Sequence, residues 1–164
     1  MLGSVTVDYP QDLAARIGFL LAQAHLIARG EADRALSELG LTAKGYAALA
    51  TVVSDAPISQ KKLSRRLRMD PATMVDVIDE LEQWGHILRR RNPGDRREYA
   101  LVTTPKGRAL FQRAQRALNA AERETLRDLD GRETRTLREL LGRIARRPGS
   151  PTTAEMEKNA LGAG

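Results

Sequence analysis

The fold is decided by residues 58–103, which read ISQKKLSRRLRMDPATMVDVIDELEQWGHILRRRNPGDRREYALVT. The first part of this stretch predicts a short helix, because Leu63 and Leu67 lie one turn apart among basic residues and Ser59 can cap its start. The apolar pattern stops after Leu67 and resumes only after a short gap. We therefore expect a short basic helix followed by a tight break.

The second helix of the stretch has the clearest start signal in the chain. Asp70 can accept backbone N–H groups as the cap, and Pro71 at the first helical position needs no hydrogen-bond donor. At about 100° per residue, four apolar side chains form one inward stripe. They are Met74, Val77, Ile78 and Leu81. Ala72 and Asp76 fall on the opposite face, so we expect this helix, ending near Gln83, to turn that face outward.

Beyond Gly85 the apolar residues alternate instead of following a helical period, which predicts two strands. The sequence Asn-Pro-Gly-Asp at residues 92–95 supplies the turn between them. Five arginines lie within nine positions of this hairpin. They are Arg89, Arg90, Arg91, Arg96 and Arg97. This charge density favours a polyanion as partner, and the alternative is a solvated charged surface.

Two helices followed by a basic hairpin are typical of a winged helix-turn-helix. A B-DNA major groove about 12 Å wide admits one α-helix, and in this fold the second helix of the pair enters it. Strands of about five residues, at about 3.3 Å each, are long enough to carry the hairpin tip across the DNA backbone. Arginines at the tip would then reach a minor groove, where negative potential is concentrated.

The rest of the chain is expected to be helical on both sides of this unit. The apolar spacing predicts one long helix from Asp12 to Leu39, ended by Gly40, and a second helix capped by Thr42. After the hairpin, Thr104 and Pro105 start another long helix, which breaks at Gly131 before a last helix over residues 132–146. The predicted fold class is therefore mainly α with a small β-hairpin wing.

These elements divide the chain into four parts. Residues 10–39 form an N-terminal helix, residues 41–103 the winged helix-turn-helix, residues 104–147 two C-terminal helices, and residues 148–164 a flexible tail rich in Pro, Gly, Ser and Thr. A length of 164 residues suits one such domain with appended arms. The apolar stripes of the terminal helices are interpreted as dimer and domain core.

Composition excludes several other classes of protein. The absence of cysteine rules out disulfides, thiolate metal sites and thiol nucleophiles. Only His25 and His86 are present, without metal-ligand spacing, a phosphate loop or a nucleophile elbow, so we expect no enzyme activity, catalytic residue, cofactor or metal. Residues 58–108, with 12 basic and 7 acidic groups, carry +5 of the net charge of +6. Without a bilayer-length apolar run or a signal peptide, the chain is expected to be cytoplasmic and not bound to a membrane.

The central region resembles the multiple-antibiotic-resistance regulator (MarR) family of bacterial winged-helix transcription regulators. The most specific match is the wing, where Asp95 and Arg97 precede the helix start Leu-Val-Thr-Thr-Pro-Lys-Gly. Element order is similar over about residues 10–147, and the sequence itself mainly over residues 58–110. The resemblance implies a homodimer with interlocked arms from both termini, a pseudo-palindromic double-stranded DNA operator, a repressor role and a small aromatic or phenolic effector.

The resemblance also implies roles for individual residues. Members of the family present four positions of the recognition helix to bases, and these correspond to Ala72, Thr73, Val75 and Asp76. The wing motif corresponds to Asp95, Arg96 and Arg97. On the short basic helix, Lys61, Lys62 and Arg65 are expected to supply the phosphate contacts, because these three and Arg66 cannot all face one way.

Several of these assignments have an alternative. Asp95 can orient Arg97 by an ion pair or bond its own backbone in the turn. Thr73 can contact DNA or bond locally near the helix cap. Asp76 is acidic where relatives often carry a basic or hydrogen-bonding residue, so it either accepts from cytosine N4 or is repelled by phosphates. For the whole chain, the alternative function is a helical protein-interaction module with a winged-helix core, supported by the acidic outer face of the second helix.

Overall fold

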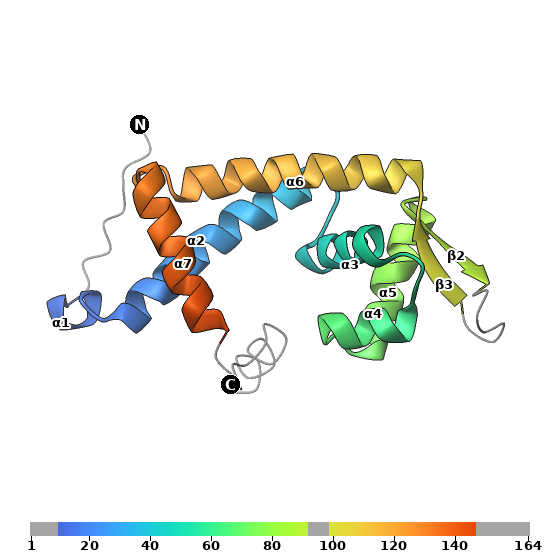
Figure 1. Cartoon of the computed structure of the whole chain (residues 1–164), viewed down its shortest axis with the longest axis horizontal. Coiled ribbons are helices and arrows are strands. Elements are labelled where there is room, and N and C mark those ends of the chain that lie inside the picture. The colour runs from blue at the N-terminus through green and yellow to red at the C-terminus, as the bar shows by residue number, and fades with distance from the viewer. Residues whose placement is uncertain (1–9, 92–98, 147–164) are drawn as a thin grey trace.

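The computed structural model describes residues 10–91 and 99–146. It contains ten elements, drawn in Figure 1. They are α1 (Gln11–Ala14), α2 (Ile17–Ser37), α3 (Ala43–Asp55), β1 (Ile58–Ser59), α4 (Gln60–Leu67), α5 (Pro71–Gln83), β2 (Ile87–Arg91), β3 (Tyr99–Thr103), α6 (Pro105–Thr125) and α7 (Gly131–Ala145). The mainly α fold with a small antiparallel sheet, predicted from the sequence, is confirmed.

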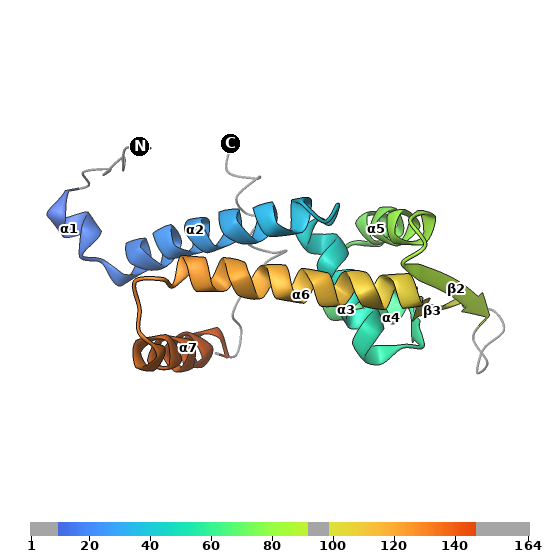
Figure 2. The same cartoon turned by 90° about the horizontal axis from the view of Figure 1, so that it is seen from above.

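Two long helices organise the molecule. α2 and α6, each of 21 residues and so about 30 Å long, run side by side in both views (Figure 1 and Figure 2). Helices α3, α4 and α5 and the sheet gather at one end of α6, whereas α7 lies at its other end. We call the first group, residues 41–103, the winged-helix lobe.

Four helices begin at the caps that the sequence predicts. In each case the side-chain oxygen of the cap accepts the backbone N–H of the residue three positions further on. The pairs are Thr42 with Gly45, Ser59 with Lys62, Asp70 with Thr73, and Thr104 with Gly107. Local hydrogen bonding therefore fixes where the chain enters α3, α4, α5 and α6.

The hydrophobic core belongs to the winged-helix lobe and its junction with α2 and α6. Among the described residues, every buried apolar side chain of this core lies between Leu36 and Ala114. The predicted inward stripe of α5 is confirmed: Met74 and Ile78 are fully buried, and Val77 and Leu81 nearly so. The sheet adds Ile58, Ile87 and Leu101 to the same cluster.

The N-terminal arm is not the single helix that the apolar spacing predicts. α1 ends at Ala14, and α2 begins at Ile17 after Arg16, whose backbone is extended with φ −78° and ψ 127°. The apolar spacing continues across this break, so periodicity alone could not reveal it. The C-terminal end of this arm is close to the prediction of a helix that reaches Leu39, because α2 ends at Ser37. Gly40 then turns the chain with a φ of +69°.

The sheet has three strands instead of the predicted two. β1 pairs antiparallel with β3 and places Ile58 opposite Leu101, while β3 also pairs with β2 and places Leu101 opposite Arg89. A strand of two residues has no alternation, so its sequence carries no strand signal. β1 nevertheless ties the wing to the start of α4.

The start of α7 also differs from the prediction by one residue. Gly131 is the first residue of the helix and does not lie outside it. Asp130 accepts the backbone N–H groups of Arg132 and Glu133, and the Glu133 side chain accepts the N–H of Asp130, which is a capping box.

Gly107 lies where α6 meets the turn before the wing. A Cβ at this position would stand 1.9 Å from the carbonyl oxygen of His86 and 2.9 Å from Cγ2 of Thr103. The same carbonyl accepts the backbone N–H of Thr104 at 3.1 Å, so the backbone cannot move away without losing this bond. The glycine is therefore required by a close approach between two backbones.

We expect Gly107→Ala to lower the free energy of unfolding by roughly 1–3 kcal/mol or more, because the added methyl group overlaps a backbone carbonyl. Urea denaturation monitored by circular dichroism measures the change. Gly131→Ala is the control, since a Cβ there meets only the end of the Arg135 side chain at 3.9 Å. Equal stabilities of the two variants would contradict the close approach.

Candidate nucleic-acid interface

The turn between α4 and α5 is short and closed by local bonds. Arg68 adopts a left-handed conformation with φ 50°, which ends α4. The Ser64 hydroxyl donates to the carbonyl oxygen of Met69 at 2.7 Å, and Asp70 caps α5 immediately afterwards. The two helices therefore have the tight connection that a helix-turn-helix requires.

The outer face of α5 is open, as predicted. Val75 is 41% exposed, and Ala72 and Asp76 are exposed as well. Thr73 is half-buried and engaged locally: its backbone N–H donates to Asp70 Oδ1 at 2.9 Å. The N–H and then the hydroxyl of Thr73 are the main causes that lower the pKa of Asp70. The local bond of Thr73 is therefore present, while its contact with DNA stays a prediction.

The basic face of α4 lies beside this surface. Lys61, Lys62 and Arg65 are all exposed. Arg66, the fourth basic residue, donates to a carboxylate oxygen of Asp55 at the end of α3. This ion pair separates Arg66 from the three residues predicted to contact phosphates.

The arginines of the hairpin do not form one cluster. Arg90 and Arg91 are exposed on β2, but Arg89 is paired with Asp79 and Glu82 of α5. Arg89 is therefore engaged within the chain, and contact of the hairpin arginines with a polyanion stays a prediction. The predicted wing residues Asp95, Arg96 and Arg97 lie outside the described residues.

Sequence reasoning missed the contact between α5 and β2 because it joins two elements with different periods. The backbone N–H of Arg89 donates to Glu82 Oε1 at 3.0 Å, and its guanidinium donates to Glu82 Oε2 and Asp79 Oδ1. Partial burial acts to lower the pKa of Arg89, but the hydrogen bonds that it donates to Asp79 and Glu82, and the negative charges of both, outweigh burial and raise that pKa. Arg89 therefore remains a cation whose charge is used within the chain.

His86 lies at the base of the wing, directly before β2. Its Nδ1 atom is buried without a hydrogen-bond partner in the described part of the chain. Burial, and then the positive charge of Lys106, lower the pKa of His86. The imidazole is therefore neutral at pH 7.

Within residues 10–91 and 99–146, no group of three or more His, Asp or Glu side chains could hold a metal ion. None of the helices described is both long enough and apolar enough to cross a bilayer.

A family model described as "MarR family" matches residues 41–99, which cover the winged-helix lobe almost completely. The HTH-type transcriptional repressor Rv2887 of Mycobacterium tuberculosis is 31% identical over 112 residues, which cover 68% of this chain and 81% of the relative. The chain belongs to the MarR family. Members of this family are transcription regulators and not enzymes.

Solved MarR structures agree with this assignment. A crystal structure of Rv2887 in complex with DNA has a TM-score of 0.68 and 29% identity and covers 83% of this chain and 99% of that chain. CouR from Rhodococcus jostii RHA1, bound to p-coumaroyl-CoA, has a TM-score of 0.68 and 28% identity over 87% of this chain and 100% of that chain. The winged-helix fold predicted from the sequence is thereby confirmed.

The lowered pKa of His86 predicts a specific pH dependence of stability. Below its ordinary pKa of 6.5, the unfolded chain binds a proton at this residue more readily than the folded MarR chain does. The contribution of His86 to stability is therefore complete above about pH 6.5 and declines as the pH falls toward the folded pKa. We expect the difference in unfolding free energy between wild type and His86→Gln to decrease from pH 7.5 to pH 5.

Urea denaturation of both proteins at several pH values measures this difference. Subtracting the unfolding free energy of the variant from that of the wild type cancels the contribution of the carboxylates, which titrate in both proteins. A difference that is constant with pH, or larger at acid pH, would contradict a buried neutral imidazole.

Proposed function

We propose that this MarR-family chain is a homodimeric, sequence-specific DNA-binding repressor whose binding responds to a small aromatic effector. The observation that carries the proposal is the open outer face of α5, presented beside three exposed basic residues of α4 and the end of the wing strands. A helix entering a major groove needs such a face, and flanking cations supply the phosphate contacts that hold it there.

Individual roles follow from position. Ala72, Val75 and Asp76 on α5 are proposed to meet base edges, and Thr73 to hold the start of the helix beside them. The proposed phosphate contacts are Lys61, Lys62 and Arg65. The proposed minor-groove residues are Asp95, Arg96 and Arg97, on the basis of the family motif.

The alternative of a protein-interaction module loses its main support. That support was the acidic outer face of α5, but Asp79 on this face is paired with Arg89. The remaining exposed acids on α5 are Asp76 and Glu80, which do not form an extended acidic surface for a basic partner.

The apolar arms support a homodimer. Ile17, Leu20 and Ile27 of α2 are 53–73% exposed, and the turn-spaced Leu140 and Ile144 of α7 are 47% and 49% exposed. α7, all of whose residues are described, buries none of them. Apolar stripes of this size on two neighbouring helices require a covering surface, and the same stripes of a second copy supply one.

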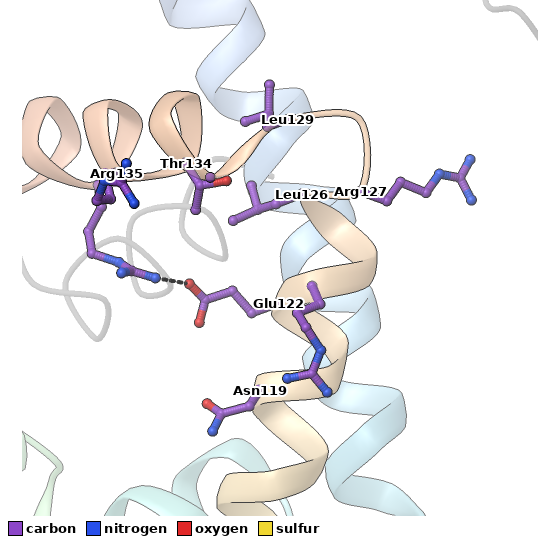
Figure 3. Close-up of a pocket in the computed structure, with 10 residues that line it drawn as sticks. Asn119, Glu122, Leu126, Arg127, Leu129, Thr134 and Arg135 are labelled. Carbon is purple, nitrogen blue, oxygen red and sulfur yellow. Dashed lines mark hydrogen bonds and ion pairs between the residues drawn. The ribbon is translucent and has the colours of Figure 1, made fainter.

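The space between α6 and α7 supports the same proposal. A cavity of about 610 Å³ separates the end of α6 from the start of α7, with Leu126 and Leu129 among its lining. Figure 3 shows Glu122 directed across it toward α7, where it accepts from Arg138 at 2.8 Å. α7 is thus joined to α6 here by one surface ion pair, which is a weak restraint. A partner chain inserted between the arms would fix α7 in place.

The effector is proposed from the relatives and from the size of one cavity. CouR binds p-coumaroyl-CoA, which carries an aromatic ring. In this chain a cavity of about 360 Å³ lies between the α2–α3 turn and the end of α5, lined by Trp84 and His86 among others. This volume is within the range of small-molecule sites, and a ligand there would touch the recognition helix directly.

The test of DNA binding is a footprint on the DNA flanking the chain's own coding region, followed by affinity measurements on the protected site. We expect Arg65→Ala to weaken binding to all sequences and to reduce the slope of log K against log salt by about 0.9, because one phosphate contact is lost. Arg127→Ala is the control, since this exposed residue lies at the end of α6 remote from the wing. Weak retention without a preferred site would contradict the proposed regulator.

We expect the wild-type protein to sediment as a dimer at micromolar concentration before DNA is added. The double substitution Leu140→Asp with Ile144→Asp should shift it to a monomer, because two charges would enter the apolar contact. Glu139→Ala changes an exposed polar residue of the same helix and should leave the dimer intact. A stable wild-type monomer with native circular dichroism would rule out the homodimer.

A further inference from the structure

One ion-pair cluster joins the recognition helix to the wing. We call Arg89 together with Asp79 and Glu82 the Arg89 clamp. Asp79 and Glu82 are three residues apart on α5 and therefore share one face of the helix. Arg89 bonds both of them through its guanidinium and bonds Glu82 a second time through its backbone N–H at 3.0 Å. The clamp thus holds both the side chain and the backbone of β2 against α5.

One arm of the clamp, the pair of Arg89 and Glu82, has both side chains partly buried, whereas Asp79 of the other arm is 57% exposed. The side chains of Arg89 and Glu82 are 24% and 32% exposed, compared with 68% and 57% for the pair Arg127 and Glu124. Partial burial and an arginine that bridges two carboxylates both strengthen such contacts and make their geometry specific. The clamp is therefore expected to restrain orientation and not merely to add surface charge.

The position of Arg89 makes this orientation important for the wing. It is the third of five residues in β2, opposite Leu101 of β3, and the wing tip follows two residues later. Because β2 and β3 are paired, a rotation of β2 at Arg89 carries the whole hairpin with it. A small angular change at the clamp therefore displaces the outer ends of both strands, at Arg91 and Tyr99.

The fold does not depend on the clamp alone. The turn between α5 and β2 is closed by backbone bonds from Gly85 to Glu82 at 2.8 Å and from His86 to Leu81 at 2.8 Å. Ile87, next to the turn, is fully buried in the core. Removing the clamp side chains should therefore leave the lobe folded while loosening the angle of the wing.

From this geometry we propose that Arg89 is a positioning residue for DNA recognition: held by Asp79 and Glu82, it sets the angle between α5 and the wing without contacting DNA. The inference rests on the proposed function. It explains why an arginine in the middle of a basic hairpin is paired with acids, and it gives the two acids of α5 a role that is not repulsion of phosphates.

The decisive variant is Glu82→Gln, measured against the operator defined by the footprint. Electrostatics alone would strengthen binding, because a negative charge near the phosphates is removed. If the clamp orients the wing, Glu82→Gln should instead weaken binding about threefold to tenfold, because the wing is no longer held at its angle to α5. Glu80→Gln is the matched control: it removes the same charge from the same helix outside the clamp, and binding should be unchanged or tighter.

Two variants of Arg89 separate positioning from direct contact. Arg89→Ala should weaken binding without altering the slope of log K against log salt, whereas loss of a phosphate contact would lower that slope by about 0.9. Arg89→Lys keeps the charge but cannot bridge two carboxylates in the same way, so it should also weaken binding. Binding of Glu82→Gln as tight as wild type, or a reduced slope for Arg89→Ala, would overturn the proposal.

A measurement without DNA distinguishes failure of this inference from failure of the proposed function. The chain has no cysteine, so Ala72→Cys and Tyr99→Cys introduce unique sites for spin labels at exposed positions on α5 and on β3 of the wing. The labelled protein is diluted with unlabelled chains so that only the two labels of one chain are close together. Pulsed electron paramagnetic resonance should then give a broader distribution of the distance between the two labels for Glu82→Gln than for Glu80→Gln. Identical distributions would refute the clamp even if the wild type binds its operator.

Discussion

The rest of the structure depends on one junction, where the turn from α5 to β2 meets the start of α6. The Thr104 hydroxyl donates to the carbonyl oxygen of Gly85 at 2.7 Å, and Lys106 Nζ donates to that of Trp84 at 2.7 Å. Gly107 lets the two backbones touch. This junction fixes the recognition helix relative to the long helix α6. The end of α5 and the start of α6 are therefore joined by a close approach of two backbones at Gly107 and by the side chains of Thr104 and Lys106.

The distribution of buried side chains divides the chain into two kinds of structure. The winged-helix lobe has its own core, in which Leu49, Leu63 and Leu101 are fully buried. The outer parts of α2 and α7, as described, have apolar stripes but no core of their own. On the proposed function, the second copy that covers the arms also sets the spacing between the two winged-helix lobes. This spacing would have to match the distance between the two half-sites of a two-fold symmetric operator.

The sequence predicted the features that depend on neighbouring residues. The caps at Thr42, Ser59, Asp70 and Thr104 and the inward stripe of α5 are local patterns, and all of them are confirmed. The break at Arg16, the strand β1 and the pairing of Arg89 were not predicted. The pairing of Arg89 joins segments distant in sequence, β1 is too short for a period, and the apolar spacing continues unbroken past Arg16. The DNA contacts of α4, α5 and the wing remain predictions, because they depend on a partner as well as on the fold.

The acidic residues of α5 are the least expected feature of a helix proposed to enter a groove of DNA. Phosphates repel an exposed carboxylate, so each acid there must have a compensating role or lower the affinity. Asp70 caps the helix, and Asp79 and Glu82 bind Arg89, so three of the acids on or next to α5 are used within the chain. Asp76 is the acid left on the exposed face near Val75, and cytosine N4 is the base group that an acid there can recognise. On the proposed function, α4 and the wing therefore supply affinity, while α5 supplies discrimination.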